Sequence, residues 1–514
     1  MKNFIFILFF LLPTIFFGQN VTTKGVDFWF GFNENILTPT LSIQIASDRN
    51  TSGSISSPIP GWSQTFQVAA DSVIEVEFPI DVVMAVNSDL SEPKGIHLVA
   101  NDSVSVSLIN TSTKSTDATN ILPTHLLGLD HYIFSYSRTI GAGRSQFLIV
   151  ATEDNTTIQI TPTAETTGGQ AANIPFNILL EAGEVFQVKS EEGDLTGSSV
   201  NASKPVAVYG SHECAIVPGE AWCDHLVEQM YPVSLWGAEF ITMPLDTRLN
   251  GNTYIIMASE DNTTILLDST LLINLDAGQF TEQIIEDSKL ISSNKPISVG
   301  LYSNSQTYDD VSDSDPFLLM LPQVGQGIKK SIFSTIGGDK ITAHYINLIV
   351  ETKNVEKVKL NGVLIPEFFY DPINLTDYSF ATLNITEGMY TLESVDSIPF
   401  SAYSYGFGNA ESYGYVLGDM ILPDLLTSST SLTKEKYELY PNPTRSHSVL
   451  KFNNENKLSH NLKIFSIDGK LIREINQINS DRVTIDNTGL PKGLYILQLA
   501  NEEKIRIIDK LVFE

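Results

Sequence analysis

The sequence predicts an all-β protein of four tandem β-sandwich-like repeats, each about 100 residues long, followed by a smaller C-terminal β domain. Short runs alternate β-favouring apolar residues with polar ones, as in VIEVEF (73–78), SVSVSLI (103–109) and TTIQI (156–160), and Asn, Asp, Gly or Pro bound them. No segment has the apolar periodicity of an amphipathic helix of ordinary length. The same order of motifs also recurs along the chain.

The clearest internal match aligns FLIVATEDNTTIQI (147–160) with YIIMASEDNTTILL (254–267), an offset of 107 residues. LSIQIASDRNTSGSI (41–55) fits the same frame, and INLIVETKNVEKVKL (346–360) is a fainter fourth copy. Self-similarity at a fixed period is the signature of a repeated structural unit. Four copies of one unit are therefore expected.

Other landmarks repeat in the same order and define the limits of each copy. An aromatic strand opens each unit, a hairpin that often carries Lys-Pro follows, and an apolar element ending in proline closes it. The predicted repeats span about residues 27–123, 132–232, 239–322 and 330–423. About seven candidate strands per repeat suit a β-sandwich, whereas the competing four-bladed propeller has about four strands per blade.

The N-terminus predicts export. Residues 1–18 combine Lys2, an apolar run from Phe4 to Phe17 and the small residue Gly18, which is the pattern of a secretory signal peptide. The alternative is a membrane anchor, but Pro13 interrupts the run and it is shorter than the ~20 residues that span a bilayer. We expect no transmembrane segment after cleavage of this signal.

Charge is distributed unevenly. Residues 1–433 hold 18 Lys and Arg against 49 Asp and Glu, a net charge of −31, whereas residues 434–514 hold 13 against 11. An acidic body repels phosphate groups, so a nucleic-acid partner is excluded. The sequence also lacks GxSxG, HExxH, GxxxxGK[ST] and GxGxxG motifs, so we expect no enzyme and no cofactor.

The two cysteines, Cys214 and Cys223, lie in the run HECAIVPGEAWCDH. An even pair this close in an exported chain predicts a disulfide that closes a small loop. The alternative is a zinc site formed by His212, the two cysteines and His225, although HxC is less usual than CxxC for such sites. The disulfide is the preferred interpretation, with no metal.

The cysteine loop has an equivalent in every repeat, at 110–120, 304–316 and 406–414. These segments differ while their flanks repeat, which is typical of binding loops on a common scaffold. The candidate binding residues in the cysteine loop are His212, Glu213, Trp222, Asp224 and His225. In the third loop, a weaker candidate for cation binding comprises Asp309, Asp310, Asp313 and Asp315, with a solvated acidic loop as the alternative.

Residues 194–240 resemble the amino-terminal domain of IgG Fc-binding proteins. The matching features are the DLTG, KPV, GSHEC, CDHLVEQ and WG motifs between Asp194 and Gly237. The resemblance covers residues 27–423 and implies a binding function.

The tail resembles a type A sorting domain of the type IX secretion system, through YELYPNPTRSHSVLKF (437–452), NLKIFSIDGKLI (461–472), TGLPKGLYILQL (488–499) and KIRIIDKLVFE (504–514). The resemblance implies a small immunoglobulin-like β-sandwich over residues 437–514, handling by the type IX machinery, and a location outside a Gram-negative bacterium or on its outer membrane. Residues 424–436 are polar and are expected to form a linker.

These observations favour a secreted or cell-surface binding or adhesion protein whose repeat loops engage a host or matrix protein or glycoprotein. One alternative is an extracellular polysaccharide or protein hydrolase, which requires acidic or His residues to converge in one cleft. Another is a structural surface-layer or gliding component without a specific ligand.

Overall fold

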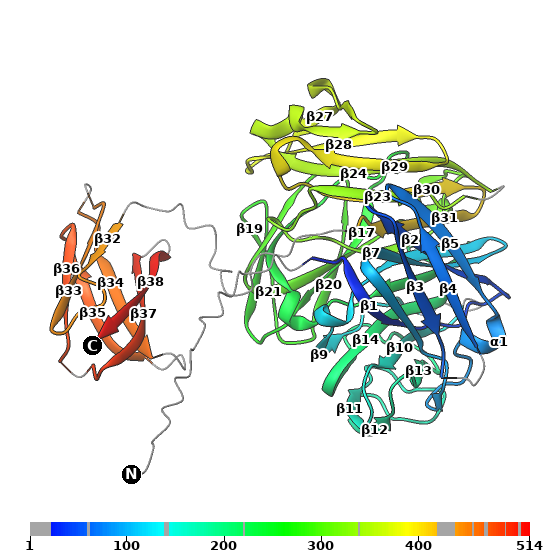
Figure 1. The fold of residues 1–514 in the computed structure, drawn as a ribbon, viewed down its shortest axis with the longest axis horizontal. Coiled ribbons are helices and arrows are strands. Elements are labelled where there is room, and N and C mark those ends of the chain that lie inside the picture. The colour runs from blue at the N-terminus through cyan, green and yellow to red at the C-terminus, as the bar shows by residue number, and fades with distance from the viewer. Residues whose placement is uncertain are drawn as a thin grey trace, which may run out of the picture. The chain divides into compact units, whose positions relative to one another are not determined.

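The computed structural model describes residues 22–58, 62–137, 143–218, 222–337 and 340–418, and in the tail 437–454, 457–466, 471–488, 490–501 and 505–513. The predicted signal peptide (1–18) and linker (424–436) lie outside the described residues. The chain divides into two compact units after Pro423. Figure 1 shows that strands dominate both units, which confirms the all-β prediction.

The first unit contains four groups of strands, and the first three share one pairing order. The first group comprises β1 (Gly25–Phe30), β2 (Thr40–Ser47), β3 (Thr51–Ser56), β4 (Ser63–Val68), β5 (Ser72–Phe78), β7 (Ile96–Ser112) and β8 (Ser115–Ile121). The second comprises β9 (Gly128–Tyr132), β10 (Ser145–Ala151), β11 (Thr156–Thr161), β12 (Phe176–Leu180), β13 (Val185–Lys189), β14 (Ser199–Ala215) and β15 (Asp224–Gln229), with β6 (Ser91–Glu92) added at its edge.

The third group comprises β16 (Gly237–Ile241), β17 (Asn252–Ala258), β18 (Thr263–Leu267), β19 (Thr270–Leu275), β20 (Phe280–Ile285), β21 (Leu290–Tyr302) and β22 (Leu318–Met320). The fourth comprises β23 (Lys330–Ser334), β24 (Ile341–Glu351), β25 (Val358–Leu360), β26 (Val363–Leu364), β27 (Tyr370–Pro372), β28 (Tyr378–Ile385), β29 (Met389–Ser394), β30 (Ser401–Gly408) and β31 (Glu411–Val416).

Each of the first three groups is organised around one long strand. The first half of β7 pairs with β1 and β3, and its second half pairs with β2 and β8. The strands β14 and β21 do the same in their groups. In the fourth group this strand is divided into β29 and β30 by the turn η5 (Val395–Ser397), and two separate sheets result.

Helices are few and short. Among the described residues, α1 (Ile80–Val83) and α2 (Gln306–Asp309) are single turns, and the other helical turns are η1 (Thr124–Leu126), η2 (Val233–Leu235), η3 (Thr352–Lys357) and η4 (Glu367–Phe369). Prolines precede η1, η2 and η4 at the position where their fixed φ suits the start of a turn. No described helix is long and apolar enough to cross a membrane.

The last strands of the four groups lie together. The strand β8 contacts both β15 and β31, and β22 contacts the same two strands, so the four form a closed cycle. One continuous apolar core includes residues from all four groups. The predicted boundaries of the repeats stay a prediction, because the groups share this core.

The second compact unit follows Pro423. It contains a three-stranded sheet of β32 (Tyr437–Tyr440), β33 (His447–Phe452) and β36 (Arg482–Asp486), and a four-stranded sheet of β34 (His460–Ser466), β35 (Leu471–Ile478), β37 (Gly493–Asn501) and β38 (Ile505–Phe513). Leu450, Ile464 and Leu497 contribute to a core of its own.

Candidate functional site

The segments that join the long strand to the last strand of each group meet at one end of the cycle. Lys114, in the β7–β8 turn, donates its backbone N–H to the Glu411 carboxylate of β31. Val217, in the cysteine loop, donates its backbone N–H to Ser305 Oγ at 3.0 Å. Ser412 Oγ donates to the Pro316 carbonyl at 2.9 Å. The four connections therefore contact one another and form a single surface region, which we call the hairpin junction.

Two of the four predicted loops are mostly strand. Residues 110–120 and 406–414 lie largely within β7, β8, β30 and β31, and only the turns at 113–114 and 409–410 separate the strands. The polar residues of these segments suggested loops, but most of them, including Asn110, Asp117 and Ser412, are buried. The longer connections are the cysteine loop and the segment 303–317, which contains α2.

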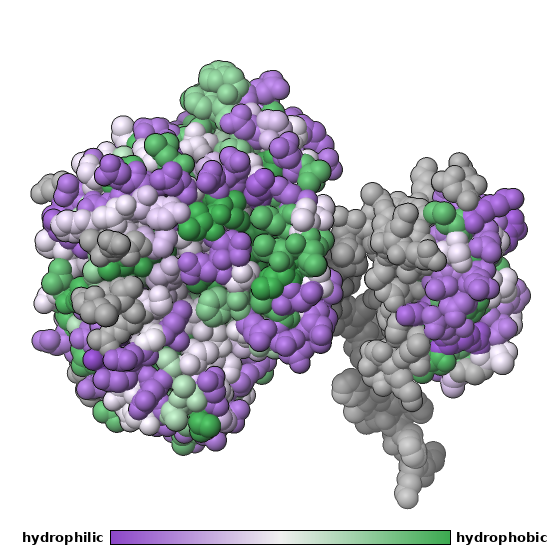
Figure 2. All heavy atoms as spheres, turned by 180° about the vertical axis from the view of Figure 1, so that it is seen from behind, coloured by the Kyte–Doolittle hydropathy of each residue, from purple (hydrophilic) through white to green (hydrophobic). Residues whose placement is uncertain are grey.

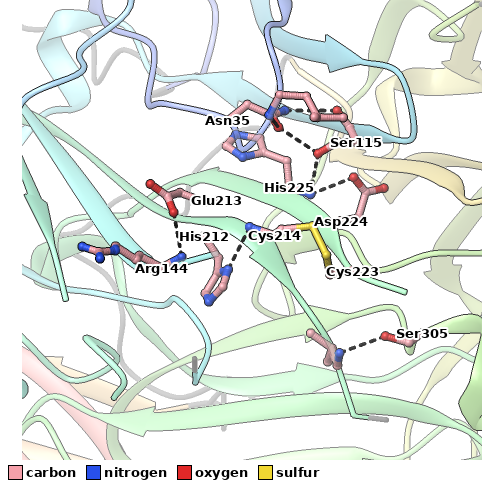
Figure 3. Close-up of a disulfide and its surroundings, with 12 residues drawn as sticks. Asn35, Ser115, Arg144, His212, Glu213, Cys214, Cys223, Asp224, His225 and Ser305 are labelled. Atoms are coloured by element: carbon pink, nitrogen blue, oxygen red, sulfur yellow. Dashed lines mark hydrogen bonds between the residues drawn. A yellow bond between two sulfur atoms is a disulfide. The ribbon is translucent and has the colours of Figure 1, made fainter. Parts of the chain in front are cut away.

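Cys214 and Cys223 form the predicted disulfide, with their Cα atoms 5.0 Å apart (Figure 3). This confirms the disulfide and makes the zinc interpretation wrong, because oxidised cysteines do not act as thiolate ligands. The bond joins the end of β14 to the residue directly before β15.

The structure changes the interpretation of the candidate binding residues. His212, Asp224 and His225 are fully buried. His212 Nδ1 accepts the Cys214 N–H at 3.0 Å, and the His225 N–H points to Ser115 Oγ at 3.2 Å, as Figure 3 shows. A macromolecule at the surface cannot reach these three side chains, so they support the loop from within.

Glu213 is also engaged inside the protein. Its carboxylate accepts the Arg144 backbone N–H at 2.9 Å and lies 3.0 Å from Lys189 Nζ. Lys189 also pairs with Glu34, which comes from the first group of strands. Glu213 thus connects two strand groups.

Trp222 is the candidate residue that faces solvent, with 50% of its surface exposed. Its backbone is left-handed, with φ 66°, and Cys223 follows it directly. Lys114 Nζ lies 5.7 Å from the centre of the indole ring, within range of a cation–π interaction. With the Gln306 amide oriented to donate to the Ser312 carbonyl, its oxygen accepts the Trp222 Nε1–H at 2.8 Å. Contacts from three connections therefore hold an exposed aromatic ring in place.

The four strand groups also contribute buried carboxyl groups that the sequence did not single out as a set. Asp117, Asp224, Asp315 and Glu411 come from four different strand groups. Burial raises the pKa of Asp224 well above its usual range, and Asp315, Glu411 and Asp117 add to the rise. Burial also raises the pKa of Asp315 to about 8, with Glu411 adding and Arg248 opposing. Asp315 is therefore mostly neutral below about pH 8.

Two buried acids, Asp117 and Glu228, hold the cycle of last strands together. Asp117 Oδ2 accepts the Val227 N–H of β15 at 3.0 Å and the Leu318 N–H of β22 at 3.1 Å. Glu228 Oε1 accepts the Met320 N–H at 3.0 Å. These side chains replace the backbone acceptors that an ordinary strand pair supplies. The signal in the sequence was an acid within an alternating run, at DATN (117–120) and VEQ (227–229).

The acidic loop of the third group does not bring its four aspartates together. Asp309 is buried in an ion pair with Arg248, at 2.7 Å, and Asp315 is buried separately. Asp310 and Asp313 are exposed. Over the part of the chain that the structure describes, no group of three or more His, Cys, Asp or Glu side chains is arranged to hold a metal ion. The predicted cation site is therefore not supported, and Arg248 is the partner that the sequence did not reveal.

Comparisons with known proteins give the context of this junction. A human IgGFc-binding protein is 23% identical over 387 residues, which are 73% of this chain and 7% of the relative. Among solved structures, the BSP domain of a biofilm-associated protein covers 80% of this chain and 77% of its own, with 8% identity and a TM-score of 0.14. An Escherichia coli alpha-2-macroglobulin covers 97% and 39%, with 10% identity and a TM-score of 0.15. Such scores carry no information on fold or function.

Two family models match different parts of the chain. The model of the secretion system C-terminal sorting domain matches residues 438–514. The protein is thus a type IX secretion substrate that reaches the cell surface or extracellular space of a Gram-negative bacterium of the Bacteroidetes. Neither matched family is an enzyme family. The model of the IgGFc binding protein matches residues 117–406, which is more than half of the sequence, and the chain belongs to that family.

Proposed function

We propose that this protein is a binding or adhesion protein that engages an extracellular protein or glycoprotein at the hairpin junction. The observation that carries the proposal is the geometry of Trp222. Its ring is half exposed, yet the disulfide, Lys114 and Gln306 restrain it. An aromatic ring fixed before binding loses little conformational entropy when a ligand covers it.

Tryptophan is also the residue type most often found at the energetic centre of protein interfaces. Exposing a large apolar side chain to water is unfavourable, and burying it against a ligand lowers the free energy. The position fits the architecture, because four strand groups contribute connections to the junction. The buried residues His212, Asp224 and His225 support the loop behind the ring.

The ligand class follows from export and from family membership. An exported chain meets extracellular macromolecules, and the human relative's name specifies the Fc region of immunoglobulin G. Immunoglobulin Fc is therefore one candidate among extracellular glycoproteins, beside matrix proteins.

The experiment measures the affinity of the chain lacking residues 1–18 for a panel of immunoglobulin Fc, serum glycoproteins and matrix proteins. We expect at least one to bind, and Trp222→Ala to weaken that binding at least about tenfold, or ~1.4 kcal/mol. Ile174→Ala is the matched control, because Ile174 is 59% exposed in the same strand group and lies outside the four connections of the junction.

Two results would contradict the proposal. One is the failure of every panel member to bind more tightly than bovine serum albumin. The other is equal loss of affinity in the Trp222→Ala and Ile174→Ala variants, which would place the ligand elsewhere. Enzymatic removal of glycans from a bound glycoprotein separates protein recognition from sugar recognition.

A further inference from the structure

A second exposed surface lies in the fourth strand group, away from the hairpin connections in sequence. Five large apolar side chains between β26 and β28 face solvent, and we call them the apolar knob. Their exposed fractions are Val363 70%, Leu364 47%, Phe368 81%, Phe369 44% and Leu375 66%. The Phe368 and Phe369 rings lie 4.6 Å apart. Figure 1 shows β27 at the top of the first unit, and Figure 2 shows hydrophobic residues at the same end.

Three of the five knob residues, Phe368, Phe369 and Leu375, lie in an insertion relative to the other three groups. In those groups the connection from the edge strand to the next strand spans residues 69–71, 181–184 and 276–279. In the fourth group the same connection spans residues 365–377 and contains η4 and β27. Added segments on a repeated scaffold are frequent places for binding.

The exposed residues are not needed to close the core. Ile365, Tyr370 and Ile373 of the same segment are buried, and they anchor it to the fourth group. Tyr370 and Pro372 also pair with β28, opposite Ala381 and Ser379. The insertion is thus held at its base, and the apolar side chains between these anchors remain in water.

Charge limits what can cover the knob. Residues 361–377 contain Glu367, Asp371 and Asp377, all exposed, and no Lys or Arg, and one lysine, Lys359 of β25, lies opposite Leu364. An anionic lipid surface attracts apolar segments that are flanked by basic residues and repels this one. A second copy of the chain brings a body of net charge −31 against the same carboxylates.

We propose that the apolar knob docks into an apolar pocket, rimmed by lysine or arginine side chains, on a partner protein. Phe368 and Phe369 fill the pocket, and Glu367 and Asp371 pair with its basic rim. A projecting aromatic pair supplies the apolar contact area, and the carboxylates supply the orientation and the rate of encounter. This contact is separate from the one proposed for Trp222.

The probe is a random peptide library displayed on phage and selected against the chain lacking residues 1–18. We expect selected peptides to combine aromatic or aliphatic positions with flanking Lys or Arg. Phe368→Ser should weaken their binding at least tenfold, and the double variant E367K/D371K at least threefold. Leu271→Ser is the matched control, because Leu271 is 59% exposed on β19 and lies outside the knob.

Lipid and a second copy of the chain are the other possible occupants, and each gives a distinct result that would overturn the proposal. Binding to vesicles of phosphatidylglycerol or phosphatidylcholine that Phe368→Ser abolishes would assign the knob to lipid. A concentration-dependent dimer that the same variant abolishes would assign it to a second copy. Selected peptides that are acidic, or that bind the Phe368→Ser variant unchanged, or no selected peptide at all, would also refute it. Circular dichroism of each variant checks that the fold is intact.

Discussion

The interior of the first strand group and its boundary with the second and third groups are both buried, but different chemistry builds them. Within the group, Leu41, Ile43 and Leu108 pack in an apolar core. At the boundary, Asp117 and Thr119 accept hydrogen bonds from the backbone of β15. Apolar packing tolerates small displacements, whereas a buried acceptor is satisfied at one register only. The comparison indicates that apolar burial stabilises each group and that polar contacts fix how the groups meet.

The largest expected effect comes from Asp117. Asp117→Ala removes the acceptor of three buried backbone N–H groups, those of Ala118, Val227 and Leu318, and we expect a loss of about 3 kcal/mol in the free energy of unfolding. Hydrogen exchange should accelerate at Val227 and Leu318 more than at the centre of β2. Asp117→Asn is the control, since a neutral amide keeps an acceptor oxygen. Equal exchange rates in wild type and Asp117→Ala would contradict the claim that polar contacts fix how the groups meet.

Removing the disulfide tests the same boundary between strand groups from the side of the cysteine loop. Replacing both cysteines by serine opens a loop of about ten residues, and the chain-entropy model predicts a loss of ~3 kcal/mol at most. Urea unfolding of the variant and of the wild type with and without reductant measures this loss. Trp222 fluorescence should shift to longer wavelength, because the ring loses its fixed neighbour. An unchanged spectrum would show that Lys114 and Gln306 suffice to hold the ring.

A smaller effect concerns pH. Burial raises the pKa of Glu228 and of Asp315 to about 8, so the folded state keeps protons that the unfolded state releases near pH 4. The contribution of these two groups to stability is therefore greatest at low pH, falls as pH rises towards 8 and levels off above it. Each group contributes at most about 1.4 kcal/mol per pH unit. Urea unfolding between pH 5 and pH 9 should show a shallower slope for Asp315→Asn than for wild type. Equal slopes of the free energy of unfolding against pH in the variant and in wild type would contradict the raised pKa of Asp315.

The sequence predicted features that depend on local pattern. Alternation predicted strands, and the spacing of Cys214 and Cys223 predicted their bond. It did not predict that β15 is buried on both faces, or that β14 is buried at His212, since this depends on how neighbouring strand groups pack together. For that reason His212, Asp224 and His225 were expected at the surface and are buried. Asp117 went unnoticed because a lone acid in a polar run resembles a loop residue.

The apolar knob was missed for a related reason. The run VLIPEFFY (363–370) has the composition of a buried strand, and only the structure shows that Val363, Leu364, Phe368 and Phe369 face solvent. Burial is decided by what the fold places opposite a residue, and no neighbouring strand covers this insertion among the described residues.

The closed cycle of last strands has a consequence for how the chain folds. The Lys114 and Glu411 contact joins residues 297 positions apart, so β8 gains one of its two flanking strands only when the fourth group is present. During synthesis, a polar strand face of the first three groups stays uncovered until the fourth group is present. Long-range closure of this kind slows folding and makes it more cooperative. The body therefore reaches its final form only when nearly the whole of residues 22–416 is available, shortly before the sorting domain follows.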